Sequence, residues 1–285
     1  MLRLSSNDLV KLKKLAIRIR IKTLEIIGNL GFGHIGGSMS IIELLTALYF
    51  GDILKLDPKN PRWGGRDWLI LSKGHAGPSL YTALAMKGYF PMSDLGTLNQ
   101  PGTSLPSHCD RNLTRGVDMT TGSLGLGLSM AIGVALGHRL DNRDNRVYLI
   151  LGDGECQEGQ IWEAALYAAH KRLDNLIAFI DYNHQQLDGY TEDINDLGDL
   201  RNKFEAFGWD AQEIDGHDFE EIYSAIGHAW ETKGKPSMIV MNTIKGKGCS
   251  FAEGNILNHL MYVTKEEIEE AITILNKKLN KIKKS

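Results

Sequence analysis

Short apolar runs alternate with amphipathic stretches along most of the chain. Four runs are rich in β-branched or large apolar residues and end at turns containing Gly, Asp or Asn, which predicts buried parallel strands at 68–71, 147–151, 176–180 and 238–241. Apolar residues spaced three and four positions apart predict intervening helices at 78–87, 125–139, 159–171, 200–207 and 219–230. Strands that alternate with helices of this length form crossover units. We therefore expect an α/β fold with one doubly wound, mostly parallel sheet and helices on both faces.

The two ends of the chain add further helices. The same apolar spacing predicts them at 9–26, 41–50 and 264–283. Glycines after the first of these helices break it into a loop that presents His34, and a capping box of Thr264 and Glu267 starts the last one. No linker, internal repeat or low-complexity segment interrupts the pattern, so we expect residues 1–285 to form a single domain.

Composition and charge limit the classes of partner. The 285 residues are 42% hydrophobic and 24% charged, which is typical of a globular protein. A formal net charge of −3 argues against a nucleic acid or an anionic membrane surface as the main partner. No apolar run approaches the ~20 residues that span a bilayer, and basic residues interrupt the apolar positions of the N-terminus, where a signal peptide would lie. Cys109, Cys156 and Cys249 lack paired spacing, which favours a reducing cytoplasm over a disulfide framework or a zinc site.

Two of the predicted strands lead into polar residues that suit a metal ion. One strand is followed by Asp153, which glycines flank on both sides, and the next strand is followed by Asn183. Ligands of open parallel sheets bind beyond the carboxyl ends of the strands, so adjacent strands would bring these two residues together. A carboxylate and an amide oxygen suit a Mg²⁺ ion shared with a diphosphate, and flanking glycines let a phosphate approach the backbone closely. Taken alone, the Gly-Asp-Gly segment is equally compatible with a tight turn, and Asn183 with a helix or turn cap.

The residues around these positions extend the pattern. The stretch at 152–164 reads GDGECQEGQIWEA, and Asn-Leu at 175–176 and Asp-Tyr-Asn at 181–183 follow it. Together they resemble the thiamine diphosphate motif of transketolases. The resemblance implies that thiamine diphosphate binds here with Mg²⁺, for which Ca²⁺ or Mn²⁺ can substitute. It assigns the metal to the side chains of Asp153 and Asn183 and to the backbone carbonyl of Gln185.

Four histidines occupy the places of that family's active-site motifs. His34 follows a glycine, His75 lies in SKGHAG at 72–77, His108 follows Pro-Ser, and His259 follows TIKGKG at 243–248. The resemblance implies that they polarise the carbonyl and hydroxyl groups of a ketose, shuttle protons and contact the diphosphate. An unperturbed pKa of about 6.5 suits histidine to that work. We expect the remaining histidines, His138, His170, His184, His217 and His228, to be packed or surface residues.

A glycine-rich turn adds the other end of the cofactor site. The sequence TTGSLGLG at 120–127 resembles the family segment that holds the aminopyrimidine ring and the bent shape of the cofactor. The resemblance also places Gly154 at the diphosphate and Glu158 against the catalytic Glu of a partner across the subunit interface. In full, the cofactor contacts that it implies are made by His75, Gly122, Ser123, Leu124, Gly154, Glu155, Glu158, Asn183 and His259.

The resemblance covers only the first domain of a full-length transketolase. The missing part includes a pyrimidine-binding domain, whose catalytic Glu activates the aminopyrimidine. We therefore expect the N-terminal subunit of a two-chain transketolase, active only with a C-terminal subunit that carries this domain. The implied reaction transfers a two-carbon ketol unit from a ketose phosphate to an aldose, with sugar phosphates as substrates. Dimers within an α₂β₂ assembly are expected, through apolar surface at 122–130 and 162–169.

Other functions remain open at this point. The chain could be the N-terminal part of a deoxyxylulose-phosphate synthase or of a 2-oxo-acid dehydrogenase E1, although the joint presence of SKGHAG, TTGSLGLG and TIKGKG favours transketolase. A non-catalytic cofactor-binding module or scaffold would need neither Asp153 nor four histidines at motif positions. A Mg²⁺-dependent phosphohydrolase would need a second Asp beside the nucleophile, and the segment around Asp153 offers none.

Overall fold

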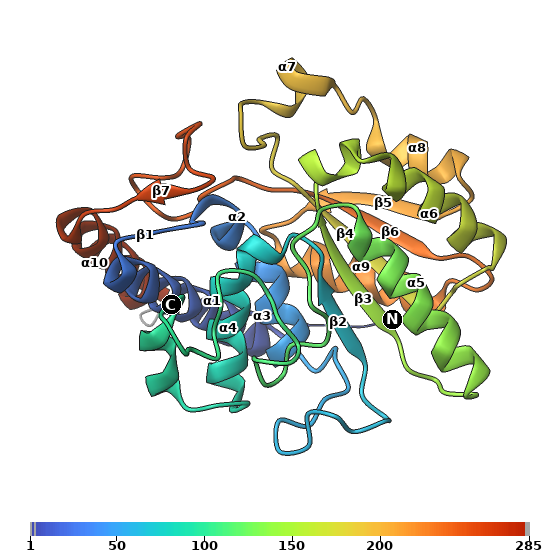
Figure 1. Ribbon diagram of the computed structural model, residues 1–285, viewed down its shortest axis with the longest axis horizontal. Helices are drawn as coiled ribbons and strands as arrows, with labels where there is room; N and C mark the ends of the chain where they lie inside the picture. The colour runs from blue at the N-terminus through green and yellow to red at the C-terminus, as the bar shows by residue number, and fades with distance from the viewer. Residues whose placement is uncertain (1, 3, 283–285) are drawn as a thin grey trace.

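A five-stranded parallel sheet forms the centre of the computed structural model, which describes residues 2 and 4–282 (Figure 1). The strands are β2 (Trp68–Leu71), β3 (Val147–Gly152), β4 (Leu176–Tyr182), β5 (Asp210–Asp215) and β6 (Ser237–Asn242), in the order β2-β3-β4-β6-β5. Every neighbouring pair is parallel, so the carboxyl ends of all five strands meet at one edge of the sheet. The predicted α/β fold is confirmed.

Strand β5 is absent from the set that the sequence predicts. It lies at the edge of the sheet and pairs only with β6. Of its side chains only Ala211 is buried, and the others are half-buried or exposed. An edge strand of this kind lacks the continuous apolar run by which buried parallel strands are recognised.

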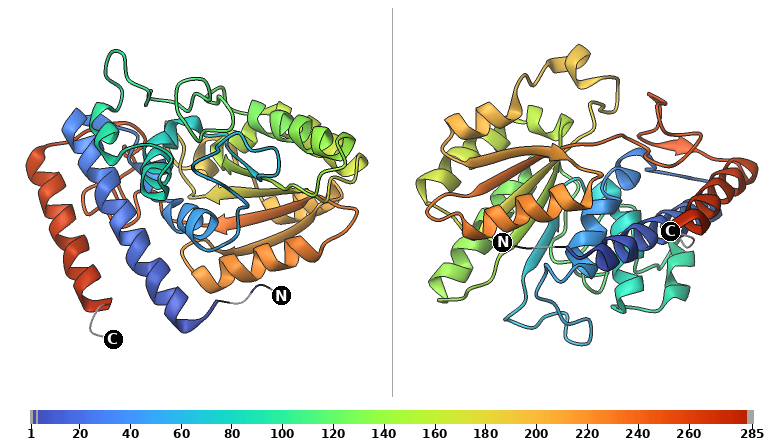
Figure 2. Two further views of the ribbon diagram at one scale, coloured as in Figure 1. Left: turned by 90° about the horizontal axis from the view of Figure 1, so that it is seen from below. Right: turned by 180° about the vertical axis from the view of Figure 1, so that it is seen from behind.

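Helices cover both faces of the sheet. They are α1 (Ser6–Leu30), α2 (Gly36–Met39), α3 (Ile42–Phe50), α4 (Gly77–Lys87), α5 (Leu126–Leu140), α6 (Gly159–His170), α7 (Thr191–Asn195), α8 (Leu200–Ala206), α9 (Phe219–Glu231) and α10 (Lys265–Ile282), with 3₁₀ turns at Gly74–Ala76, Met92–Thr97 and Gly154–Gln157. Alternate residues of β3 show the division between the faces. Tyr148 and Ile150 pack into a core with α1, α3, α4 and α9, whereas Leu149 and Leu151 pack with α5, α6 and α8 (Figures 1 and 2). None of the helices that the described residues form is long and apolar enough to cross a membrane.

Helix α10 begins at the predicted capping box. The backbone N–H of Thr264 donates to Glu267 Oε2 at 2.8 Å, and the N–H of Glu267 donates to Thr264 Oγ1 at 3.2 Å. The helix then runs beside α1, where a Cβ on Gly28 would lie 2.9 Å from Ile268 Cγ1, so the glycine permits the close approach (Figure 2). Position 283, the last of the predicted helix, lies outside the described residues.

A small two-stranded sheet joins the segment that follows α1 to the segment that precedes α10. Strand β1 (Phe32–Gly33) pairs antiparallel with β7 (Met261–Tyr262). Phe32 lies opposite Tyr262, and Gly33 lies opposite Met261. The loop that follows β1 and the segment that precedes β7 therefore lie side by side.

Candidate active site

A cavity of about 270 Å³ opens at the carboxyl ends of β3 and β4. Strand register places Gly152 beside Asp181, so the residues that follow the two strands reach the same space. We call it the strand-end cavity; its lining residues are Gly37, Lys73, His75, Leu124, Gly152, Asp153, Gly154, Glu155, Gln157, Glu158, Asn183, Gln185, Gln186, Leu187, Lys245 and His259. Most of the residues that the sequence singles out for the cofactor and the metal meet here.

Asp153 provides a buried carboxylate with an unused oxygen. Its side chain is only 2% exposed. Oδ1 accepts the backbone N–H of Gly154 at 2.8 Å, whereas the buried Oδ2 has no hydrogen-bond partner. Burial, together with the nearby charge of Asp181, raises the pKa of Asp153 to about 7. A buried carboxylate that costs this much to ionise is stabilised by a cation, so the site fits a metal ion.

Asn183 is held in place by its neighbours. Its Nδ2 donates to Asp181 Oδ2 at 2.7 Å, which fixes the amide orientation, and its Oδ1 accepts the backbone N–H of Gln185 at 3.2 Å. Asn183 and Gln185 are both buried at the strand-end cavity, and Gln185 Oε1 also lacks a partner. Mg²⁺ usually takes one or two carboxylates, and phosphate oxygens and water complete its shell. One carboxylate with amide and carbonyl oxygens nearby fits that donor set.

Asp181 lies beneath the cavity and joins four segments of the chain. It is completely buried and accepts hydrogen bonds from Ser40 Oγ at 2.7 Å, Lys73 Nζ at 2.5 Å, Asn183 Nδ2 at 2.7 Å and Thr243 Oγ1 at 2.5 Å. Burial alone would raise the pKa of Asp181, but the Lys73 ammonium and these donors hold it below its usual value. The network gives the cavity a rigid floor.

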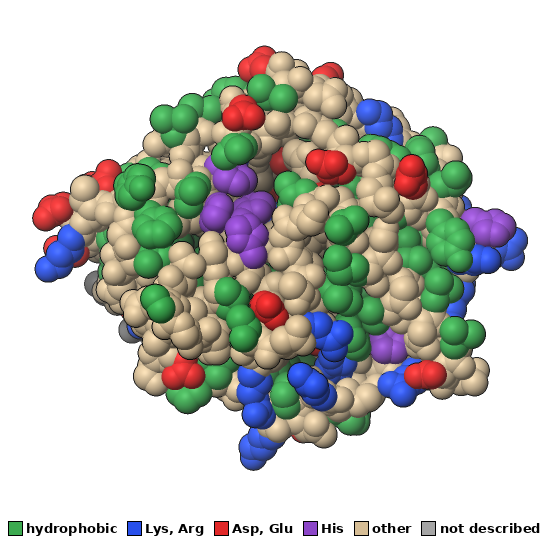
Figure 3. Space-filling view, in the orientation of Figure 1, with side chains coloured by type: hydrophobic (Ala, Val, Ile, Leu, Met, Phe, Trp, Pro, Cys, Tyr) green, Lys and Arg blue, Asp and Glu red, His purple; other side chains and the backbone are tan. Residues whose placement is uncertain are grey.

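The four motif histidines gather in one cluster, although they come from four separate segments. His34 is central: its ring centroid lies 5.3 Å from that of His75, 5.5 Å from His108 and 5.4 Å from His259. The rings of His75 and His259 are 4.7 Å apart, and both line the strand-end cavity. Figure 3 shows the histidine side chains together on one face of the molecule, beside a hollow.

The histidine rings are neutral near pH 7. Burial, with smaller contributions from other histidines and Lys245, lowers the pKa of His34 to about 4 and that of His259 to about 3. Burial also lowers the pKa of His75, well below 6.5, and that of His108. A neutral imidazole has one N–H donor and one free lone pair, so each ring can donate to a ligand oxygen or accept from a hydroxyl.

The glycine-rich turn lies next to this cluster. Gly122 and Gly125 have φ values of 145° and 88°, and a Cβ on Gly122 would lie 3.0 Å from His108 Cδ2. Of the turn residues expected to contact the cofactor, Leu124 lines the strand-end cavity, whereas Gly122 and Ser123 do not. The turn is thus placed against the histidines, and only part of it reaches the cavity.

Glu155 and Glu158 differ in their surroundings, although both line the strand-end cavity. The carboxylate of Glu155 is buried and accepts the N–H of Gly125 at 2.9 Å, the N–H of Gly152 at 3.0 Å and the hydroxyl of Ser72. These bonds join the glycine-rich turn to the ends of two strands. Glu158 is exposed at the mouth of the cavity, where another chain could reach it.

Two lysines belong to the site without having been assigned a role from the sequence. Lys73 pairs with Asp181, and Lys245 donates to the backbone carbonyls of Gln185 at 3.3 Å and Gln186 at 3.2 Å. Burial lowers the pKa of Lys245 to about 8. Both lie inside motifs that the sequence shows, SKGHAG and TIKGKG, but these motifs were used to assign His75 and His259. A buried ammonium beside a free carboxylate oxygen suits an anionic ligand that also brings a cation.

Comparison with known sequences identifies close relatives. Residues 12–281 match the family model for the transketolase thiamine diphosphate-binding domain. A 6-deoxy-6-sulfo-D-fructose transketolase subunit from Clostridium sp. is 57% identical over 272 residues, which are 95% of this chain and 98% of that protein. One of the subunits of an apulose-4-phosphate transketolase from Phocaeicola vulgatus is 38% identical over 93% of this chain and 94% of its own length.

Solved structures show the same architecture within longer proteins. A transketolase from Leishmania mexicana superposes with a TM-score of 0.86 at 29% identity, over 99% of this chain. The matched region is 45% of that protein, so this chain spans less than half of the solved transketolase.

Proposed function

We propose that this chain, which belongs to the family of transketolase thiamine diphosphate-binding domains, is the diphosphate-binding subunit of a two-chain transketolase. Relatives that match almost from end to end are named as transketolase subunits, and the matched solved transketolase is about twice as long. The observation that carries the proposal is the unpartnered Oδ2 of Asp153, buried in the same cavity as His75 and His259. A protein that served only as a scaffold would not need a buried, unpaired carboxylate oxygen in the same cavity as these histidines.

Thiamine diphosphate and Mg²⁺ are the groups that the strand-end cavity would hold. Asp153, Asn183 and the carbonyl of Gln185 would hold the metal ion, while Gly154 and His259 would lie against the diphosphate. The cofactor, when bound, supplies the carbon nucleophile needed to carry a two-carbon unit, and the protein supplies orientation and electrostatics. Lys245 adds positive charge to the same cavity.

The chain's own contribution to the transfer is made by the histidine cluster. Because His34, His75, His108 and His259 are neutral near pH 7, each can donate an N–H to a ketose oxygen or accept a hydroxyl proton. A positioned acid or base of this kind contributes about 10²–10⁴-fold to rate. The Asp181 network holds Asn183 and Thr243 still while the histidines act.

A ketose that carries an anionic phosphate or sulfonate group is the proposed donor. The Clostridium relative is named for a sulfonated ketose and the Phocaeicola relative for a phosphorylated one. We propose a ketose phosphate or its sulfonated counterpart as donor and an aldose as acceptor, in the cytoplasm. The chemistry of the histidine cluster concerns only carbonyl and hydroxyl groups, so it fits either donor.

A second polypeptide is proposed to complete the site. Large apolar side chains on α5 and α6 are exposed, among them Leu126 at 42% and Leu166 at 62%. Leu124, at the cavity, is also exposed. Exposed large apolar side chains beside a cavity are typical of a protein interface. The partner would bring a pyrimidine-binding domain and its catalytic Glu, in an α₂β₂ assembly with twofold symmetry.

Reconstitution tests this function. Ketol transfer and molecular mass are measured for this chain alone, for the isolated pyrimidine-domain partner and for the mixture, with thiamine diphosphate and Mg²⁺ present. Activity is expected only in the mixture; the mixture with Asp153→Ala should be inactive, and that with Asp144→Ala, an exposed position, should be active. Full activity from this chain alone would overturn the two-chain proposal. Consumption of pyruvate by the mixture would instead assign the chain to a deoxyxylulose-phosphate synthase or a 2-oxo-acid dehydrogenase E1.

A further inference from the structure

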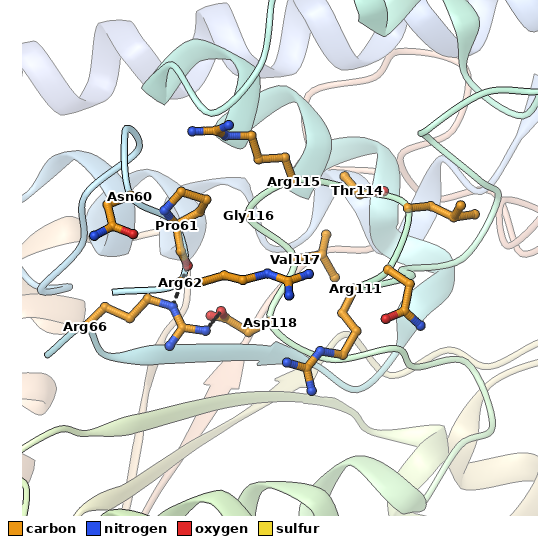
Figure 4. Close-up of a pocket in the computed structure, with 12 residues that line it drawn as sticks. Asn60, Pro61, Arg62, Arg66, Arg111, Thr114, Arg115, Gly116, Val117 and Asp118 are labelled. Atoms are coloured by element: carbon orange, nitrogen blue, oxygen red, sulfur yellow. Dashed lines mark hydrogen bonds and ion pairs between the residues drawn. The ribbon is translucent and has the colours of Figure 1, made fainter. Parts of the chain in front are cut away.

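A second cavity, of about 450 Å³, shares no lining residue with the strand-end cavity. It lies between residues 60–66 and residues 111–118, and we call it the arginine pocket (Figure 4). Four arginines line it: Arg62, Arg66, Arg111 and Arg115. In Figure 3 basic side chains gather on the face that also shows the histidines.

One arginine of the pocket is part of its wall. Arg66 is 8% exposed; its Nη2 lies 2.6 Å from Asp118 Oδ1, and its Nε donates to the carbonyl of Pro61 at 2.8 Å. Its guanidinium also stacks 4.4 Å from the centroid of the Trp68 ring. Asp118 accepts the backbone N–H of Leu69 as well, at 2.9 Å. The single carboxylate of the pocket is therefore already neutralised.

Among the described residues, the other three guanidinium groups have no ion pair of their own. Neither Arg62 nor Arg111 has a hydrogen-bond acceptor for its guanidinium; Arg111 stacks 5.5 Å from the centroid of the Trp68 ring, and it is attracted to Asp118, which already pairs with Arg66. Arg115 donates only to the backbone carbonyls of Pro58 and Lys59, both at 3.0 Å. Figure 4 shows Arg62 and Arg111 directed toward the same part of the cavity as the Arg66–Asp118 pair. Like charges brought together in a concave site repel one another and raise the local concentration of anions.

We propose that the arginine pocket binds a phosphate group, either free or as part of a small phosphorylated molecule. Planar guanidinium forks match the oxygens of a phosphate in pairs, and the preset Arg66 stiffens the site. The volume of about 450 Å³ lies within the range of small-molecule sites and exceeds the needs of phosphate alone, so it favours a phosphorylated metabolite. The proposal does not depend on ketol transfer.

The pocket is connected to the histidine cluster through one loop. Arg111 follows His108 closely in the sequence, and its backbone N–H donates to Thr120 Oγ1 at 3.1 Å. The N–H of Thr121 donates to the carbonyl of Cys109 at 3.0 Å, and Gly122 lies against the His108 ring. A ligand that orders Arg111 would therefore act on the segment that positions His108.

Calorimetric titration with glycerol 3-phosphate tests the proposal, because this compound is neither a ketose nor an aldose. The full chain is titrated at low ionic strength with glycerol 3-phosphate, inorganic phosphate and glycerol. We expect binding of the two phosphates and none of glycerol. Tighter binding of glycerol 3-phosphate identifies a phosphorylated metabolite as the ligand, and equal affinity identifies free phosphate. Absence of binding by either phosphate overturns the proposal.

Paired variants locate the site. Arg62→Gln with Arg111→Gln should weaken phosphate binding at least tenfold, whereas Arg18→Gln with Arg201→Gln, two exposed arginines outside the pocket, should change it less than twofold. Asp153→Ala, at the strand-end cavity, should leave it unchanged. Equal losses in the two arginine pairs would show non-specific charge attraction and refute a site. Unchanged phosphate binding in the pocket variant, with loss of binding to the pyrimidine-domain partner, would show that an acidic segment of the partner fills the pocket instead.

Discussion

Replacement of Asp181 by Asn removes the negative charge that holds together the buried hydrogen-bond network beneath the strand-end cavity. The carboxylate is 0% exposed and accepts four hydrogen bonds, one of them from the almost equally buried Lys73. An asparagine amide offers one oxygen in place of two and turns an NH₂ toward groups that themselves donate. At least one donor loses its acceptor, and the Lys73 ammonium loses its paired negative charge while keeping the carbonyl of Gly37, at 2.8 Å.

The expected loss of stability is large. Breaking a buried ion pair by removing one partner costs about 3–5 kcal/mol, because the remaining charge is left unpaired. For a chain of this size that corresponds to a fall in Tm of roughly 5–8 °C. The exposed pair Lys265–Glu269, separated by 3.6 Å, is the control, and Glu269→Gln should cost less than about 0.5 kcal/mol.

Thermal and urea unfolding of the chain measure these differences. Adding Lys73→Met to Asp181→Asn removes the ammonium that the first substitution leaves unpaired. The double variant should therefore lose less free energy of unfolding than the sum of the losses of the two single variants. Because the pKa of Asp181 is lowered in the fold, Asp181 stabilises the protein above about pH 4, and this stabilisation is lost as the pH falls further. The free energy of unfolding of Asp181→Asn should therefore depend less on pH below about pH 4 than that of the wild type. A loss no greater than that of Glu269→Gln would refute the reasoning.

Three further predictions concern the strand-end cavity and the histidine cluster. Asp153→Ala or Asn183→Ala should abolish Mg²⁺-dependent binding of thiamine diphosphate by the assembled complex while leaving the fold intact, and wild-type affinity in calorimetry would contradict the metal assignment. His75→Ala should lower turnover by about 10²–10⁴-fold and weaken cofactor affinity far less; a twofold loss in steady-state kinetics would make His75 structural. Because the pKa values of His34 and His259 are lowered to about 4 and 3, NMR titration should show neither ring protonating between pH 8 and 5.5. Their burial should reduce stability as the pH falls below about 6.5, where the unfolded chain takes up protons first.

The sequence predicts most of the sheet because four of its strands are buried on both sides. Such strands appear as plain apolar runs, and β3 and β4 come out within a residue or two of their observed bounds. The edge strand β5 carries Asp, Gln and Glu, which a sequence pattern cannot tell from a polar loop. The two-residue strands β1 and β7 have no periodicity at all.

Those residues of the candidate site that lie in short sequence motifs could be predicted. The juxtaposition of Asp153 and Asn183 follows from adjacent parallel strands, which the sequence suggests. The contact between His34 and His259 depends on pairing between distant segments, and no local pattern encodes it. The role of Lys245 could not be predicted from the sequence for another reason. A lysine in a glycine-rich loop is usually solvated, and only the fold shows that this one is buried.

The pairing of β1 with β7 also bears on the order in which the protein folds. His34 and His259 can meet only after the chain between them has closed into a long loop, and contacts of such sequence separation are entropically the slowest to form. The β3–β4 crossover that places Asp153 beside Asn183 closes a far shorter stretch. We therefore expect the side of the cavity that carries Asp153 and Asn183 to form before the side that carries the histidines, so that contact between these two rings marks a chain that has finished folding.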